Sequence, residues 1–173
     1  MALKEVFEHV AKFFEECKMD YAVIGAFALY GFGYVRATRD IDFVTRIENQ
    51  GRIKSFLENL GFNTDHCSSA FSNHLHPVGN VRVDIMYVEG NTADEIFAHV
   101  QKRILFRGHE YPVVAPEHLI AMKLFAASQN PERKLKDLAD VREIIRRTDI
   151  NRETIKKLFA KYRLEKYYDD VEN

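Results

Sequence analysis

The sequence predicts an α+β fold, in which a mixed β-sheet is backed by helices and followed by a helical C-terminal third. Two observations lead to this prediction. Short apolar segments typical of strands alternate with amphipathic segments as far as residue 115. From residue 116 onward the apolar residues recur only at helical spacing. We therefore expect an α/β core at residues 1–115 and a helical region at residues 116–173 that packs on this core.

The first half of the core opens with an amphipathic helix. Val6, Phe7 and Val10 lie at helical spacing, with Lys and Glu residues between them. Gly31 is expected to end the second helix and Gly61 the third, because glycine favours the backbone conformation found just past a helix. The expected elements of this half are helices at 3–17, 26–30 and 49–60 and strands at 21–25, 40–45 and 62–67.

The second half of the core contains two hairpins. Gly79-Asn80 is typical of a two-residue hairpin turn, and a helix capped by Asn91 or Thr92 follows the hairpin. Asn130-Pro131 and Thr148-Asp149 interrupt the helical pattern of the C-terminal third. The expected elements are strands at 73–78, 81–88, 103–106 and 111–114, helices at about 92–100, 116–128, 131–147 and 151–163, and a frayed tail at 167–173.

Composition limits the classes of protein to consider. The 173 residues fit one domain with a small helical appendage, and 46% hydrophobic residues are ample for a core. A formal net charge of −1 argues against a protein that coats nucleic acid through bulk positive charge. Cys17 and Cys67 form no disulfide framework. The sequence shows no stretch of the ~20 apolar residues of a membrane helix and no signal peptide, so we expect a cytoplasmic protein with no membrane partner.

Three aspartates are unusual because they occur in apolar strands. Side chains alternate along a strand, so Asp40 and Asp42 share one face while Ile41 points to the other. Asp84 lies between apolar neighbours, where an unpaired acid is costly. If the two strands are adjacent, the three carboxylates converge, and divalent cations that prefer oxygen would relieve their repulsion. We predict that these aspartates are catalytic and bind two Mg²⁺ ions, for which Mn²⁺ can substitute.

The turn at Gly79-Asn80 also predicts a strand register. With a two-residue turn, Val78 faces Val81 and Asp84 faces Leu75. Asp84 then lies on the face opposite Val83, and the hairpin presents its carboxylate on the same side as the other two aspartates if the strands are neighbours.

Histidines near this hairpin form a rival metal site. His74 and His76 share a strand face, which in the predicted register is the face opposite Asp84. Together with His66 and Cys67 they fit no recognised zinc spacing. We therefore favour ordinary sheet or surface histidines over a zinc site.

Gly25 has a separate physical role, because it ends the first strand directly before a short helix. Glycine allows the backbone to approach a ligand closely. The N–H groups at the start of the helix, together with its positive dipole end, favour phosphate. The Gly25-Ala26 step therefore predicts a phosphate cradle near the aspartates.

Together these residues resemble the DNA-polymerase-β-like nucleotidyltransferase superfamily. The shared pattern is Ile24-Gly25-Ala26, thirteen intervening residues, Asp40-Ile41-Asp42-Phe43, and a later Asp84. The residues near this pattern, Ala28-Leu29 and Arg36-Ala37-Thr38-Arg39, resemble those of the small prokaryotic branch that includes AbiEii-type toxins. The resemblance covers residues 20–90, and more loosely residues 112–145.

The resemblance implies a nucleotidyltransferase-like sheet and specific roles in the site. Asp40, Asp42 and Asp84 would bind the metals, and Asp84 would also help to activate the acceptor hydroxyl. The backbone N–H groups of Gly25 and Ala26 would hold the triphosphate of an NTP. The family usually has Ser or Gly where this chain has Ala26, so one contact to the triphosphate from a hydroxyl is missing.

The C-terminal third adds cationic candidates. Lys123 lies in an almost wholly apolar helix, so it needs a partner: an ion pair with Asp137 or Asp140, snorkelling to solvent, or a bound nucleotide phosphate. We assign Lys123 to the nucleotide phosphates and Asp137 to a supporting polar role, following the resemblance to the later Lys and Asp motifs of the AbiEii-like branch. Further candidates for phosphate contacts are Arg36, Thr38 and Arg39, and for guiding an anionic acceptor Arg133, Lys134 and Lys136.

The leading functional hypothesis is a Mg²⁺-dependent nucleotidyltransferase that transfers an NMP from an NTP to an unidentified hydroxyl acceptor. The acceptor classes left open are a tRNA, a protein and a small molecule. The alternative is a non-catalytic nucleotide-binding module or one partner of a toxin–antitoxin pair, favoured by Ala26 and the small size of the chain. Metal-dependent phosphate hydrolysis is a weaker third hypothesis, because no residue is marked as a dedicated base for water.

Overall fold

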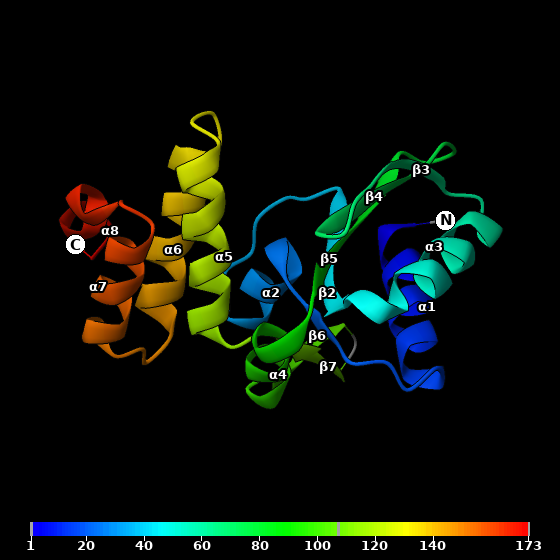
Figure 1. The fold of residues 1–173 in the computed structure, drawn as a ribbon, viewed down its shortest axis with the longest axis horizontal. Coiled ribbons are helices and arrows are strands. Elements are labelled where there is room, and N and C mark those ends of the chain that lie inside the picture. The colour runs from blue at the N-terminus through cyan, green and yellow to red at the C-terminus, as the bar shows by residue number, and fades with distance from the viewer. Residues whose placement is uncertain (1, 107, 173) are drawn as a thin grey trace.

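The computed structural model describes residues 2–106 and 108–172, and it has the α+β architecture that the sequence predicts (Figure 1). In this part of the chain the helices are α1 (Leu3–Glu16), α2 (Gly25–Gly31), α3 (Gln50–Asn59), α4 (Gly90–Ala98), α5 (Pro116–Gln129), α6 (Lys134–Arg147), α7 (Arg152–Lys161) and α8 (Tyr168–Glu172). The strands are β1 (Tyr21–Val23), β2 (Asp40–Arg46), β3 (Asn63–Cys67), β4 (Phe71–His76), β5 (Val81–Val88), β6 (Gln101–Phe106) and β7 (His109–Val113). Short 3₁₀ turns occupy Ile47–Asn49 and Glu165–Tyr167.

The strands of the described residues form one mixed sheet in the order β3-β4-β5-β2-β1-β7-β6. β2 pairs in parallel with β5, and β1 in parallel with β7, whereas β1 with β2 and β4 with β5 are antiparallel. Two strands that are far apart in the sequence, β2 and β5, are therefore direct neighbours at the centre of the sheet. This pairing confirms the strand adjacency on which the predicted site depends.

The hydrophobic core lies between the sheet and α1. Phe43 of β2 packs against Phe7 and Phe14 of α1, with ring centroids 5.2 and 5.4 Å apart. Ile41 and Phe43 are fully buried on this side, so the alternating Asp40 and Asp42 point to the other side of the sheet. Figure 1 shows α1 and α3 on one side of β2 and β5, and α2, α4 and α5 on the other. The aspartates therefore face the side on which the C-terminal helices lie.

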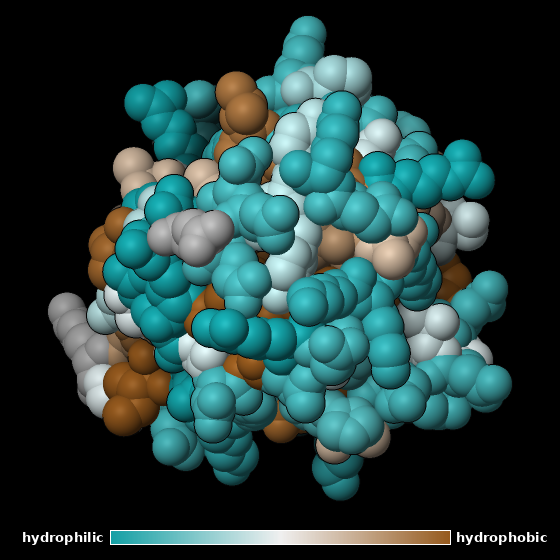
Figure 2. Space-filling model, turned by 90° about the vertical axis from the view of Figure 1, so that its left-hand side faces the viewer, coloured by the Kyte–Doolittle hydropathy of each residue, from teal (hydrophilic) through white to brown (hydrophobic). Residues whose placement is uncertain are grey.

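The elements of the described chain change from mixed to helical at Pro116, where α5 begins. Helices α5 to α8 pack side by side at one end of the molecule (Figure 1). Figure 2 shows that the outer face at this end is mostly hydrophilic, with hydrophobic residues scattered among the polar ones. None of the described helices is both long enough and apolar enough to cross a membrane. The division into a core at 1–115 and a helical region at 116–173 stays a prediction.

Two expectations about the chain path were wrong. The β4–β5 hairpin pairs His76 with Val81, so its loop has four residues and Asp84 faces Asn73 instead of Leu75. Pro77 explains this shift, because it has no N–H to continue the ladder. The tail is also not frayed over its described part, because α8 buries Tyr168, whose ring packs edge-on against Phe159 of α7 at 5.5 Å.

Candidate active site

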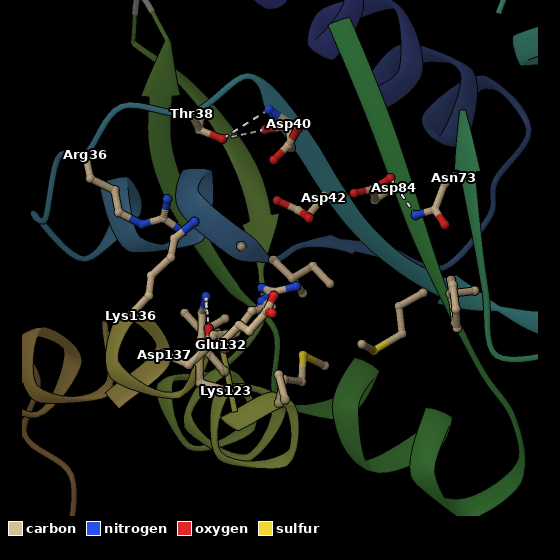
Figure 3. A pocket seen from close by; sticks show the side chains of 18 residues that line it. Arg36, Thr38, Asp40, Asp42, Asn73, Asp84, Lys123, Glu132, Lys136 and Asp137 are labelled. Atoms are coloured by element: carbon tan, nitrogen blue, oxygen red, sulfur yellow. Dashed lines mark hydrogen bonds and ion pairs between the residues drawn. The ribbon is translucent and has the colours of Figure 1, made fainter. Parts of the chain in front are cut away.

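Three carboxylates lie together on one face of the sheet. The parallel register of β2 and β5 pairs Asp42 directly with Asp84, and Asp40 lies two residues before Asp42 on the same face. Figure 3 shows the three side chains projecting into one cavity, with Asp42 between Asp40 and Asp84. We call these three residues the acidic cluster. The structure thus places these candidates as the sequence predicted.

The start of α2 lies against Asp42. Gly25 has a left-handed backbone with φ of +64°, which favours glycine. A Cβ added at Gly25 would lie 2.0 Å from Oδ2 of Asp42, so no other residue fits without movement. Ile24 also donates its N–H to the carbonyl oxygen of Asp42 at 3.0 Å. The strand-to-helix turn and the acidic cluster are therefore one local unit.

Burial and mutual repulsion disfavour the charged forms of these acids. Burial raises the pKa of the Asp42 carboxyl to about 6; the negative charge of Asp84 adds to the rise, and the positive charge of Lys123 opposes it. Burial also raises the pKa of Asp84, although the hydrogen bond from Asn73 lowers it. None of the three carboxylates has an ion pair among the described residues. A cation placed among them would be strongly favoured.

Asn73 is part of the site although the sequence analysis did not assign it a role. Its Nδ2 donates a hydrogen bond of 2.7 Å to Oδ1 of Asp84, because the four-residue loop places the two residues opposite each other. This contact fixes the orientation of the Asp84 carboxylate. The absent N–H of Pro77 was the sequence signal for this register.

A second group of charges lies across the cavity, with a buried lysine and two buried aspartates at its centre and two arginines at its edge. Lys123 of α5 lies 3.1 Å from Oδ1 of Asp137 and 2.7 Å from Oδ2 of Asp140, both on α6. Nε of Arg36 is 3.2 Å from Asp140, and Nε of Arg133 is 3.5 Å from Asp137. The two aspartates are 0% and 2% exposed and Lys123 6%. We call these five residues the buried ion cluster. Its contacts are those of the alternative for Lys123, an ion pair with Asp137 and Asp140, and the predicted contact of Lys123 with nucleotide phosphates stays a prediction.

Both clusters line a single cavity of about 550 Å³, a size typical of sites for small molecules. One wall consists of β2, β4, β5 and the start of α2, and the other of α5 and the residues around the start of α6 (Figure 3). The polar lining residues are Arg36, Thr38, Asp40, Asp42, Asn73, Asp84, Lys123, Glu132, Arg133, Lys136 and Asp137. The remaining lining residues are Ile24, Gly25, Phe71, Met86, Leu119, Met122 and Ala126.

The cavity brings together most of the predicted nucleotide-binding residues. Thr38 holds the start of β2, because its Oγ1 accepts a hydrogen bond from the N–H of Asp40 at 3.1 Å. Ala26 is 4% exposed and lies in the first turn of α2, but its side chain does not line the cavity. Arg39 lines a separate hollow with Gly79 and Asn80. Lys134, proposed as a guide for an acceptor, does not line the cavity either, and it lies 5.8 Å from the ring of Tyr167.

The histidines of the rival zinc site have other neighbours. The ring of His74 is fully buried between the hydroxyl oxygens of Thr64 and Ser72, at 3.1 and 2.8 Å. His66 stacks on Phe71 at a centroid distance of 4.7 Å. His76 contacts the carbonyl oxygen of Val78. Within residues 2–106 and 108–172, no group of three or more His, Cys, Asp or Glu side chains is arranged to hold a metal ion, and this applies to the acidic cluster as well as to the histidines.

The fold is that of nucleotidyltransferases. It is similar to the antibiotic-resistance factor ANT(2″)-Ia in solution, with a TM-score of 0.72 and 18% identity over 96% of this chain and 94% of that one. It is also similar to the lincosamide antibiotic adenylyltransferase LnuA, with a TM-score of 0.62 and 16% identity over 84% of this chain and 97% of that one. It is also similar to an antigenic nucleotidyltransferase-like protein from Paracoccidioides brasiliensis, with a TM-score of 0.62 and 17% identity over 98% of this chain and 91% of that one.

The sequence itself gives the family. Residues 22–169 match the model of a family described as uncharacterised nucleotidyltransferase. Because this match covers most of the chain, the protein belongs to that family. No curated protein matches the sequence. The AbiEii-type branch is not confirmed by these comparisons and stays a prediction.

Proposed function

We propose that the protein is a Mg²⁺-dependent nucleotidyltransferase that transfers an NMP from an NTP to an acceptor hydroxyl. The observation that carries this proposal is the acidic cluster, in which Asp42 and Asp84 are direct partners on adjacent strands and neither forms an ion pair with a described residue. Membership of the nucleotidyltransferase family supports the same reaction. The proposal also includes a cytoplasmic location, which the sequence led us to expect.

The donor set fits magnesium. Asp40, Asp42 and Asp84 supply carboxylate oxygens, the ligands that Mg²⁺ and Mn²⁺ prefer. The raised pKa of Asp42 indicates that its charged form is poorly stabilised by the protein. A divalent cation bound beside it would stabilise that charge. Magnesium usually takes only one or two carboxylates and completes its shell with water and substrate phosphates. Bound there, two metal ions would neutralise charge on the phosphates during transfer.

The remaining cavity residues are suited to the triphosphate. The first N–H groups of α2, at Gly25 and Ala26, have no acceptor within the helix and are free for phosphate oxygens. Arg36 and Lys123 supply positive charge across the cavity from Asp42, and this charge opposes the rise in the pKa of Asp42. We propose that these residues bind the NTP, with Thr38 and Arg39 at the edge of the site and Asp137 holding Lys123 in place.

The proposed reaction forms one bond and breaks another. The acceptor oxygen attacks the α-phosphorus, the bond from that phosphorus to the bridging oxygen breaks, and pyrophosphate leaves. Asp84 accepts the proton of the acceptor hydroxyl. The hydrogen bond from Nδ2 of Asn73 orients the Asp84 carboxylate for this step.

The test measures incorporation of label from [α-³²P]NTPs into acceptor pools with Mg²⁺ or Mn²⁺. We expect Asp42→Asn to reduce transfer by about 100-fold or more, because it removes a metal-ligand charge. Asp65→Asn is the matched control, because Asp65 is exposed on the edge strand β3. Equal NTP affinity, metal affinity and transfer in Asp42→Asn and wild type would refute the site assignment.

A second candidate function rests on Ala26. The buried methyl group of Ala26 supplies no hydroxyl to a triphosphate, which would suit a non-catalytic nucleotide-binding module or a toxin–antitoxin partner. This candidate predicts that the protein binds NTP with Mg²⁺ but transfers no label to tRNA, protein or small-molecule acceptors. Transfer to any of these acceptors would exclude it.

A further inference from the structure

We propose that the acceptor is a small, uncharged alcohol with a flat apolar body, which stacks on Phe71 and packs against Met86 and Met122 on the Asp84 side of the cavity. This inference rests on the proposed nucleotidyl transfer and names the class of its second substrate. It depends on three observations: the division of the cavity into two ends, the in-line geometry of the reaction, and the distribution of charge.

The Asp84 end of the cavity is apolar. Phe71 and Met86 are register partners on β4 and β5, two residues from Asn73 and Asp84 on the same face. Met122 of α5 lines the same cavity from the opposite wall. The Phe71 ring is 45% exposed although it lines a cavity, and His66 stacks against it at 4.7 Å. An aromatic ring supported in this way and not covered by the core is suited to stacking with a flat ligand.

The direction of the reaction assigns this end to the acceptor. The attacking and leaving oxygens lie roughly in line on opposite sides of the α-phosphorus. In Figure 3 the cationic Arg36 and Lys136 lie on one side of Asp42, and Asp84 with Asn73 lies on the other. Leaving pyrophosphate is expected on the cationic side. The attacking hydroxyl therefore arrives from the Asp84 side, where the apolar residues are.

The charges in the cavity disfavour a polycationic acceptor. Its lining carries four cationic side chains, those of Arg36, Lys123, Arg133 and Lys136, and five carboxylates, those of Asp40, Asp42, Asp84, Glu132 and Asp137. The acidic cluster is assigned to metal ions, and Asp137 already pairs with Lys123 and Arg133. Among the described lining residues this leaves Glu132 as the one carboxylate for a cationic ligand. A molecule with several ammonium groups would find only this one carboxylate, beside the cation of Lys136.

The size of the site favours a small molecule over a macromolecule. About 550 Å³ must hold the NTP and the reacting part of the acceptor. The formal net charge of −1 provides no bulk attraction for nucleic acid.

The proposed transfer balances with this acceptor. The alcohol oxygen bonds to the α-phosphorus, its proton passes to Asp84, and pyrophosphate is released. The product is therefore a phosphodiester that joins the NMP to the apolar alcohol.

The test compares Phe71→Ala with Phe125→Ala, because Phe125 is an exposed phenylalanine at 54% that lies outside this cavity. The probes are 2-(2-naphthyl)ethanol and the polycation tobramycin, each measured by ligand-observed NMR in the presence of Mg²⁺ and a non-hydrolysable ATP analogue. We expect Phe71→Ala to weaken naphthylethanol binding about tenfold through loss of the stacked ring, with the ATP-analogue affinity unchanged within twofold. Phe125→Ala should leave both unchanged, and tobramycin should not displace naphthylethanol.

The outcomes separate this inference from the proposed function. If wild type binds the ATP analogue but not naphthylethanol, or binds tobramycin in preference, the acceptor class is wrong while nucleotidyl transfer stands. If Phe71→Ala weakens the ATP analogue and spares naphthylethanol, the apolar end holds the nucleobase and the inference is overturned. If wild type binds no ATP analogue and transfers no label from any NTP, the proposed function itself fails.

Discussion

The acidic cluster and the buried ion cluster line the same cavity but are balanced in opposite ways. In the buried ion cluster, Lys123 lies within 3.1 Å of both Asp137 and Asp140, and Arg36 and Arg133 add further positive charge. In the acidic cluster the described residues provide no cation in contact, and Asn73 donates the one side-chain hydrogen bond to a carboxylate. Both carboxylates of the first cluster have cations at contact distance within the protein, although Oδ2 of Asp137 and Nε of Arg36 lack hydrogen-bond partners, whereas the second cluster has no such cation among the described residues.

This difference separates charges that the protein pairs itself, although Arg36 and Lys123 also face the nucleotide, from charges that it leaves for bound cations. Burial is costly for any charge unless a partner compensates for it. The buried ion cluster meets that condition with residues from α5, α6 and the segment before β2, so it joins the helical part of the chain to the sheet. The acidic cluster does not meet it, and the raised pKa of Asp42 is the consequence. Perturbation of this kind in a cavity is typical of functional sites.

The largest effect is expected from breaking the balanced cluster. Lys123→Met removes the cation that both buried aspartates share, so we expect the free energy of unfolding to fall by about 3–5 kcal/mol. This is a large part of the stability of an ordinary domain. Urea unfolding followed by circular dichroism measures the change. Lys12→Met is the control, because the Lys12 side chain is 71% exposed and should change stability by less than about 0.5 kcal/mol.

A double variant sharpens this prediction. Adding Asp137→Asn to Lys123→Met removes one of the two uncompensated carboxylates, so part of the lost stability should return. If Lys123→Met unfolds at the same urea concentration as Lys12→Met, the cluster is not the structural element that its contacts indicate.

Removing a charge from the acidic cluster should raise the stability of the metal-free protein, whereas removing Lys123 should lower it. The pKa of Asp42 in the folded protein, about 6, lies above the ordinary value of 3.8. Between these values the folded state binds more protons than the unfolded state, so stability falls as pH rises from about 4 to 6. At about 1.4 kcal/mol per pKa unit, the loss amounts to no more than about 3 kcal/mol. Asp42→Asn removes this loss, so at pH 8 without metal it should be more stable than wild type.

Thermal unfolding in EDTA across pH 4 to 8 measures this effect. Asp65→Asn should follow wild type at every pH. Addition of Mg²⁺ and an NTP should then raise the unfolding temperature of wild type at pH 8 but not that of Asp42→Asn. An Asp42→Asn variant that is less stable than wild type at pH 8 would contradict the unbalanced cluster.

The sequence predicted the face of each aspartate better than it predicted their exact partners. The β4–β5 register is shifted by two residues, and because strand periodicity is two, Asp84 stays on the predicted face while its partner changes from Leu75 to Asn73. Alternation also explains Arg39, which points away from Asp40 and lines a separate hollow. Local rules therefore determined orientation, whereas the turn geometry around Pro77 determined the partner.

Contacts between distant segments were harder to predict. That Lys123 needs a partner follows from its apolar surroundings, and Asp137 and Asp140 were two acidic candidates on the following helix. The contact of Arg36 with Asp140 joins residues 104 positions apart, and no local pattern marks it. The apolar end of the cavity was missed for the same reason, because Phe71, Met86 and Met122 come from three elements that meet only in the folded protein.

The smallest expected effect tests the cradle beside the acidic cluster. Ala26→Ser introduces a hydroxyl at a position where the superfamily that this sequence resembles usually has Ser or Gly. Ala26 lies in the first turn of α2, where serine is tolerated, so stability should change by less than about 1 kcal/mol. Because the Ala26 side chain is 4% exposed and does not line the cavity, the added hydroxyl should not reach the triphosphate, and NTP affinity should change by less than about twofold. Ala98→Ser, at the end of α4, is the control for a serine placed away from the cavity. Isothermal titration with an ATP analogue and Mg²⁺ compares the three proteins, and an affinity about fivefold higher in Ala26→Ser than in wild type would contradict this orientation of the Ala26 side chain.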